Sequence, residues 1–235
     1  MSTGACETLQ GTGGVRHHRS LTAAGEKRLL IWLARRLPHQ DNSDHLTGLG
    51  LVSSLAMAVA FGCTRIWPSA PLLVVPLLIL NWFGDSLDGT VARVRNQQRP
   101  RYGFYVDHVI DIIGMAALGV GLSASGLMSP VMALGVALAY VLIAAESFLA
   151  THTTGTFRMS FAAFGPTELR VVLAAGAIKA AFSPWISVGG FDLLLFDAGG
   201  AIAIAGMVTA FVTSAVRNAS LLFAADPRTK PVRRS

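Results

Sequence analysis

Six long apolar segments follow one another along this chain, and they restrict its fold more than any other feature. They lie at about residues 46–64, 66–92, 104–125, 129–149, 167–185 and 194–217. A helix needs about 20 residues to cross the hydrocarbon core of a bilayer, and every segment is near or above that length. We therefore expect an all-α integral membrane protein in which six transmembrane helices form one domain over residues 39–220.

The composition excludes the main alternatives. Charged residues make up 14% and hydrophobic residues 52% of the 235 residues, whereas about a quarter of a typical soluble domain is charged. Such a chain cannot cover a globule with polar surface, and it is too apolar to be disordered as a whole. Its two cysteines are too few for a disulfide framework.

The regions outside the six segments differ in composition, and each predicts a different kind of structure. Residues 1–23 contain no apolar core of the kind that a signal peptide needs, and we expect a disordered N-terminal tail. Residues 24–38 place Leu29, Leu30 and Trp32 between basic residues, which predicts a juxtamembrane interfacial helix. A helix packed on the domain is the alternative. Residues 221–235 are expected to form a basic cytoplasmic tail.

The basic residues predict the orientation. All Lys and Arg residues except Arg65 and Lys179 fall in the N-terminal leader, the second-to-third connection, the fourth-to-fifth boundary or the C-terminal tail. By the positive-inside rule, both termini and the charged end of the bundle should face the cytoplasm, in the cytoplasmic membrane. This topology accounts for the net charge of +6, so we expect no nucleic-acid partner.

Four carboxylates stand within or beside the second and third apolar segments. Asp85 and Asp88 are three residues apart and Asp107 and Asp111 are four apart, so each pair shares one face of its helix. An aspartate at mid-membrane depth costs about 2.5–3.5 kcal/mol, which means that something positive must hold these groups. Both pairs are expected near the cytoplasmic ends of adjacent antiparallel helices, where they can converge on one pocket.

Two kinds of cation could hold this cluster. Carboxylate oxygens suit hard ions such as Mg²⁺ or Mn²⁺, and four carboxylates are enough for a two-metal site that clamps the phosphates of a substrate. The alternative is pairing with the arginines between the two aspartate pairs. These are Arg93, Arg95, Arg99 and Arg101.

The residues around the aspartates complete a longer pattern. It reads Asp-x2-Asp-Gly-x2-Ala-Arg over residues 85–93 and Gly-x3-Asp-x3-Asp over residues 103–111. This pattern resembles the signature of the CDP-alcohol phosphotransferase family at every fixed position. The resemblance implies a six-helix membrane enzyme, often preceded by a cytoplasmic interfacial helix, that works as a homodimer.

The small residues of the pattern have a physical use. Gly89, Ala92 and Gly103 have almost no side chain, so a flat nucleotide could approach the helix backbone there, although small residues also serve helix packing in membranes. Arg93 supplies a fixed fork of donors for a diphosphate oxygen. The four residues are our candidates for binding the nucleotide and its diphosphate.

The resemblance also implies roles for the aspartates. Asp85, Asp88 and Asp107 match the metal ligands of the family, and Asp111 matches its catalytic base, near or also on a second metal ion. The implied reaction transfers a phosphoalcohol group from a CDP-alcohol donor to an alcohol acceptor, with release of CMP. The first arrangement is CDP-diacylglycerol with a soluble acceptor, and the alternative is a soluble CDP-aminoalcohol (choline or ethanolamine) with diacylglycerol.

Further polar residues are candidates for the substrate pocket. Thr47 leads into the first segment, Asn81 lies four residues before Asp85, and His108 follows Asp107, as in the choline and ethanolamine branch of the family. Glu168 and Arg170 open the fifth segment, in a Gly-Pro-Thr-Glu stretch similar to one in that family. Plain helix capping is the alternative at the start of the fifth segment, a polar helix contact is the alternative for Asn81, and for His108 it is an ordinary polar residue that faces away from the pocket.

Two other functions fit parts of the pattern. An intramembrane prenyltransferase also binds magnesium diphosphate with aspartates on helices, but it needs more helices and does not call for Gly89, Ala92-Arg93 or Gly103. A cation transporter could use an acidic pathway, yet these acids cluster at one end of the membrane. Glu146 is a further charge within a predicted membrane segment. It could either contribute to the substrate pocket or pair with an arginine.

Overall fold

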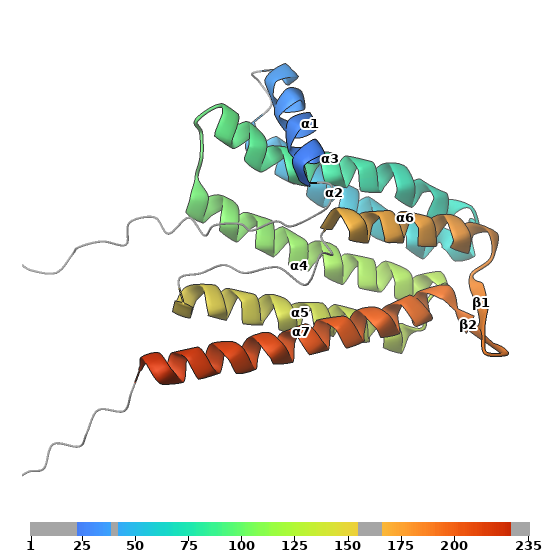
Figure 1. Ribbon diagram of the computed structural model, residues 1–235. Coiled ribbons are helices and arrows are strands. Elements are labelled where there is room, and N and C mark those ends of the chain that lie inside the picture. Colours follow the sequence, from blue (N-terminus) through green and yellow to red (C-terminus); the bar gives the residue numbers. More distant parts are fainter. Residues whose placement is uncertain (1–22, 39–41, 155–165, 227–235) are drawn as a thin grey trace, which may run out of the picture.

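A computed structural model describes residues 23–38, 42–154 and 166–226, and these form an almost wholly helical protein (Figure 1). The predicted N-terminal tail falls largely on residues 1–22, outside the described residues, as does the end of the predicted C-terminal tail. The helices are α1 (Ala23–Arg36), α2 (Ser43–Gly62), α3 (Val74–Val94), α4 (Pro100–Ser125), α5 (Pro130–Thr154), α6 (Pro166–Phe182) and α7 (Leu195–Ala225). Short 3-10 helices η1 (Cys63–Arg65) and η2 (Ala70–Leu73) connect α2 to α3.

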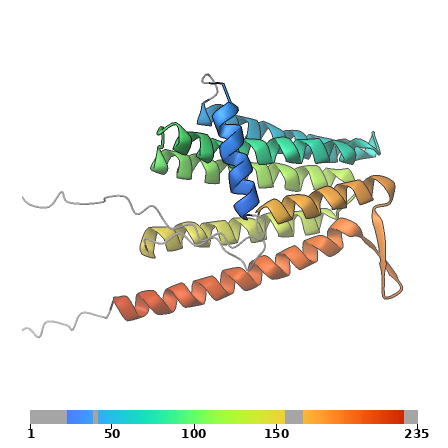
Figure 2. The same cartoon turned by 45° about the horizontal axis from the view of Figure 1, so that its top comes forward.

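Helices α2 to α7 lie side by side and alternate in direction (Figures 1 and 2). Helix α2 begins, and α5 and α7 end, at the left of both views, where α3 also turns into α4. We call this end the aspartate end. The opposite end carries a β-hairpin of β1 (Trp185–Val188) and β2 (Phe191–Leu194) between α6 and α7, and we call it the hairpin end. The predicted segments contained no sign of this hairpin.

Five helical stretches of the described chain are long and apolar enough to cross a membrane. They are Ser43–Arg65, Ala70–Val94, Pro100–Ser125, Pro130–Thr154 and Leu195–Ala225. These five helices indicate an integral membrane protein, as the sequence predicted. At 1.5 Å per residue, α6 extends only about 26 Å, short of the roughly 30 Å of a bilayer core, so the described residues do not confirm the sixth span.

Helix α2 is the centre of the aspartate-bearing half of the bundle. It packs much more extensively against α3 and α4 than those two helices pack against each other, so the expectation that the two aspartate helices are direct neighbours was wrong. Two glycines permit this approach. A Cβ on Gly84 of α3 would lie 2.5 Å from the carbonyl oxygen of Leu46, and one on Gly121 of α4 would overlap the carbonyl of Ala58.

Helix α1 crosses the bundle instead of running along it (Figure 2). Its buried Ala34 joins Leu87 and Val91 of α3 in a small apolar core. Arg95, just after α3, donates hydrogen bonds of 3.0 and 2.8 Å to the carbonyl oxygens of Leu37 and Pro38, which caps the C-terminal end of α1. One face of α1 is thus packed on the domain, and its interfacial role remains a prediction.

Glu146 joins α5 to α7. Its Oε1 accepts hydrogen bonds of 2.9 Å from Ser214 and 2.8 Å from the Asn218 amide. From the sequence we expected Glu146 either to line the substrate pocket or to pair with an arginine. The structure instead shows its carboxylate bound by neutral donors on the neighbouring helix. Such bonds hold helices together where no water is available.

Candidate active site

Asp88 is the most enclosed of the four predicted site aspartates, with 7% of its surface exposed. The Thr47 hydroxyl of α2 donates a 2.8 Å hydrogen bond to its Oδ2, and the Gly89 amide donates to its Oδ1. The Ser43 hydroxyl donates to the backbone carbonyl of Asp88 at 3.0 Å. The start of α2 therefore fixes this carboxylate, and Thr47 contacts a site aspartate from a helix that the motif does not include.

Asp85 has a cationic partner on α6. Its Oδ2 lies 2.5 Å from Nη2 of Arg170, and Nε of the same arginine donates a 3.0 Å bond to Oδ1 of Asn81. The Asn81 amide in turn donates to the Gly50 carbonyl at 3.1 Å and to the Ser54 hydroxyl at 3.0 Å. A chain of bonds thus runs from α2 through α3 to α6, which joins two of the predicted pocket residues to the first aspartate.

The two aspartates of α4 face those of α3. Asp111 lies within electrostatic range of Asp85, Asp88 and Arg170, and Asp107 lies within range of Asp88. The aspartates of α4 therefore lie in the same region of the bundle as those of α3. Within the described ranges, no three His, Cys, Asp or Glu side chains are close enough together to hold one metal ion.

The arginines between the aspartate pairs lie in several places. Arg95 caps α1, as described above. Arg99 pairs with Asp44 at 2.6 Å and stacks 4.3 Å from the centre of the Tyr102 ring, and Asp44 raises the pKa of Arg99 through this hydrogen bond. Arg93 donates a 3.0 Å bond to the Thr90 hydroxyl on its own helix. The contact of Asp85 with Arg170, by contrast, joins residues 85 positions apart.

The glycines of the motif do not serve helix packing. A Cβ on Gly89 would meet only the Arg93 guanidinium, at 3.5 Å, and one on Gly103 would meet nothing within 4 Å. The contrast with Gly84 is direct, because that glycine is needed for the contact of α2 with α3. The motif glycines keep the backbone accessible on the side of the carboxylates, and Ala92, one turn further, is half-buried.

His108 packs among aromatic side chains. Its ring is buried on α4, with Nδ1 2.6 Å from the Phe104 carbonyl oxygen, and its centre lies 4.1 Å from that of Phe104 and 4.8 Å from that of Phe148 on α5. This packing links α4 to α5. Glu168 is half-buried in the first turn of α6, two residues before Arg170.

Sequence reasoning missed a residue on α5. Tyr140 lies within electrostatic range of both Asp111 and Asp85, and it is half-buried. The available signal was that Tyr140 carries the only side-chain hydroxyl in the stretch of residues 131–145, which is otherwise aliphatic or glycine. Ser43 was also missed, because only its place at the start of α2 brings it to Asp88.

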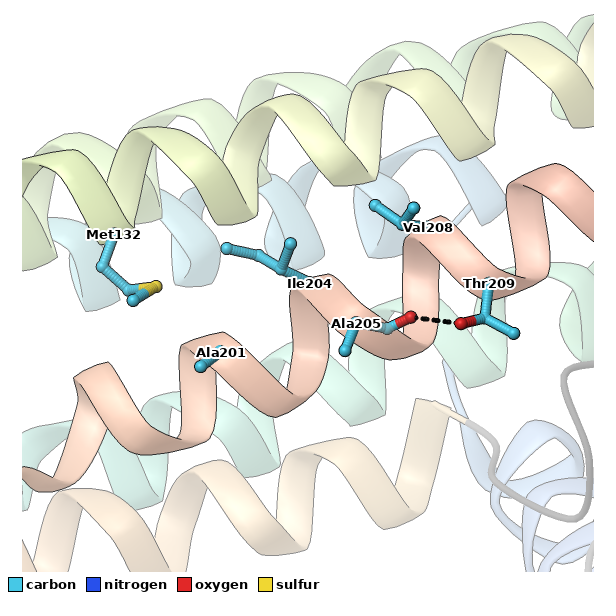
Figure 3. Close-up of a pocket in the computed structure, with 6 residues that line it drawn as sticks. All are labelled: Met132, Ala201, Ile204, Ala205, Val208 and Thr209. Carbon is cyan, nitrogen blue, oxygen red and sulfur yellow. Dashed lines mark hydrogen bonds between the residues drawn. The ribbon is translucent and has the colours of Figure 1, made fainter.

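A separate groove lies between α5 and α7 (Figure 3). It has a volume of about 490 Å³ and is lined by Met132, Ala201, Ile204, Ala205, Val208 and Thr209. The Thr209 hydroxyl is turned to the Ala205 carbonyl of its own helix, at 2.7 Å. The groove therefore presents mainly apolar groups.

Comparison with known proteins gives one result that agrees with this geometry. The model of the CDP-alcohol phosphatidyltransferase family matches residues 43–217, from the first residue of α2 into α7. Comparison with curated proteins gives no match. The matched range contains every predicted site residue, and the family transfers a phosphoalcohol group from a CDP-alcohol to an acceptor alcohol. The family predicted from the motif is thus confirmed, and the chain belongs to the CDP-alcohol phosphatidyltransferases.

Proposed function

We propose that the chain transfers the phosphatidyl group of CDP-diacylglycerol to an acceptor alcohol, with release of CMP, in phospholipid biosynthesis. The observation that carries this proposal is the open backbone at Gly89 and Gly103 beside four facing carboxylates. A flat nucleotide needs such clearance, and its diphosphate needs cationic partners next to it. The aspartates cannot bind a diphosphate by themselves, because like charges repel.

We propose Mg²⁺ or Mn²⁺, two ions in all, as the cationic partner. The donor set fits these ions chemically, since it consists of carboxylate oxygens. Asp85, Asp88, Asp107 and Asp111 would hold them, and the bound ions would neutralise the diphosphate of the donor. Thr47 orients Asp88 through its 2.8 Å bond, while Asp85 would have to exchange its contact with Arg170.

Asp111 is the proposed general base. Its carboxylate takes the proton of the acceptor hydroxyl, whose oxygen attacks the phosphorus that bears the alcohol group. The bond from that phosphorus to the CMP oxygen then breaks, and CMP leaves with its electron pair. Arg93, beside Gly89, binds a diphosphate oxygen through its planar fork. Arg170 and Glu168 at the start of α6, with Asn81, line the acceptor side.

The position of His108 favours the lipid donor. Its place after Asp107 was one reason to consider a soluble CDP-aminoalcohol with diacylglycerol, but its ring packs between Phe104 and Phe148. The position of His108 therefore no longer supports a soluble CDP-aminoalcohol donor, and only the Gly-Pro-Thr-Glu stretch still supports that alternative. The candidate acceptors are glycerol phosphate, inositol phosphate, serine and other alcohols.

Release of CMP tests this proposal. Purified protein in lipid-detergent micelles with Mg²⁺ receives CDP-diacylglycerol and one acceptor at a time, and in parallel CDP-choline or CDP-ethanolamine with diacylglycerol. We expect CMP only from CDP-diacylglycerol. CMP only from the aminoalcohols would establish the alternative, and none from any CDP-alcohol would refute both. Chelation of divalent ions should stop turnover, and Asp111→Asn should abolish it while CMP still binds.

We also propose that the aspartate end faces the cytoplasm and that the chain forms a homodimer in the cytoplasmic membrane. Arg65 follows α2 and Lys179 lies near the end of α6, so the two basic residues predicted outside both belong to the hairpin end. Reporter fusions to the two termini test the orientation, because both fusions should report a cytoplasmic location. Cross-linking in native membranes tests the dimer.

A further inference from the structure

The hairpin between α6 and α7 has two chemically different faces. Its register pairs Ile186 with Leu193 and Val188 with Phe191, and side chains of directly paired residues share a face. This face, which we call the apolar hairpin face, therefore carries four apolar side chains. The other face carries the pair of Ser187 and Asp192 near the turn and the pair of Trp185 and Leu194 at the base.

The side chains of the apolar hairpin face have little cover from the described residues. Phe191 is 75% exposed, Val188 55% and Leu193 43%. An isolated two-stranded hairpin is marginally stable in water, and a contiguous exposed apolar patch marks a contact with a partner or a membrane. An apolar neighbour is therefore needed to cover the apolar hairpin face.

The hairpin is nevertheless well defined. Gly189 and Gly190 have φ values of +59° and +86°, as a two-residue turn between twisted strands requires. Lys179 donates bonds of 3.0 Å to the Ser183 carbonyl and 3.4 Å to the Trp185 carbonyl, which ties the first strand to the end of α6. The Leu195 amide closes the base with a 2.8 Å bond to the Pro184 carbonyl.

The direction of the hairpin suits a membrane surface. In both views its strands run across the helix direction at the hairpin end, and its tip projects beyond the start of α7 (Figures 1 and 2). The charges of Lys179 and Asp197 lie at the same end, where Asp197 accepts a 2.7 Å bond from the Ser129 amide just before α5. Charged side chains are costly in the bilayer core, which favours a position of this end near the membrane surface.

Continuity with the lipid-facing surface identifies the neighbour. Phe182, the last residue of α6, is 81% exposed, Ile202 in the second turn of α7 is 76% exposed, and the hairpin joins these two helices. Ile202 lies further along α7 than Asp197 and so faces acyl chains, whereas Phe182 lies beyond Lys179 at the end of α6, at the boundary with the headgroups that aromatic residues favour. We propose that the apolar hairpin face rests in the interfacial layer of the bilayer, on the leaflet opposite the aspartates.

Site-directed fluorescence can test this contact on the full-length protein. Cys6 and Cys63 are first replaced by serine and alanine, and a polarity-sensitive dye is attached at Val188→Cys or, as the matched control, at Ser187→Cys on the other face. Each protein is reconstituted in phosphatidylcholine vesicles at two protein-to-lipid ratios. Lipids with a nitroxide at the headgroup or high on the acyl chain serve as quenchers, and iodide serves as the aqueous quencher.

The proposal predicts that the dye at position 188 shifts its emission to shorter wavelength relative to position 187. It also predicts stronger quenching by the nitroxide lipids and weaker quenching by iodide, at both protein densities. Equal exposure of both positions to iodide would overturn the proposal. So would protection of position 188 that disappears when the protein is diluted in lipid, because that result would identify a second copy of the chain as the neighbour.

Discussion

Gly89→Ala separates a substrate-binding role of the motif glycine from a structural one. A Cβ at this position would meet only the flexible Arg93 guanidinium, at 3.5 Å, so the fold should accept it. Alanine is also the better helix former, and within α3 the change should stabilise the helix by about 0.5–1 kcal/mol. The thermal midpoint of the purified protein should therefore stay the same or rise.

The enzymatic activity of Gly89→Ala, in contrast, should decrease. The new methyl group stands on the open side of the helix, where we place the nucleotide, and displaces it from the carboxylates. A misplacement of about 1 Å can reduce turnover on the order of 10²-fold, and we expect a loss of that size in CMP release, with weaker CMP binding. Gly103→Ala should behave in the same way, although its Cβ would meet no protein atom within 4 Å.

Gly84→Ala is the matched control on the same helix. Its Cβ would lie 2.5 Å from the Leu46 carbonyl oxygen and 2.7 Å from the Gly50 amide nitrogen, so α2 and α3 would have to separate. This variant should lose thermal stability first and activity as a result. Wild-type turnover in Gly89→Ala, or a stability loss in it as large as that of Gly84→Ala, would refute the role that we assign to the open backbone.

Three further predictions concern the contacts around the site. Thr47→Val removes the bond to Asp88, and since bonds to charged groups are worth about 1.5–3 kcal/mol, the thermal midpoint should fall clearly below that of Thr47→Ser. Glu146→Leu removes the acceptor that Ser214 and Asn218 share and should lower the stability by about 0.5–2 kcal/mol. Glu146→Gln keeps an acceptor oxygen and should lose much less stability. An equal loss in both variants would argue against a stabilising role of these two bonds. Arg95→Ala removes the cap of α1, so hydrogen exchange of α1 should accelerate while that of α3 stays unchanged.

Much of the site could be read from local sequence patterns. Helical spacing alone puts Asp85 with Asp88, and Asp107 with Asp111, on common faces, and the motif around them led to the family that the comparison later confirmed. Hydropathy predicted the membrane helices because a bilayer demands long apolar stretches wherever a chain crosses it. It did not predict where α6 ends, because the apolar segment continues to residue 185, whereas the helix ends at Phe182 and β1 begins at Trp185.

The other contacts of the site depend on which helix faces pack against each other, and the periodicity of the sequence does not determine this. The sequence by itself determined the membrane class, the aspartate faces and the motif, because these follow from local spacing and composition. Only the tertiary structure decided that α2 lies between the aspartate helices, that Arg170 reaches Asp85 across 85 positions, and that Glu146 binds α7. Those contacts exist because small residues such as Gly84 let particular faces approach, and close packing then selects the partners of every polar group buried between them.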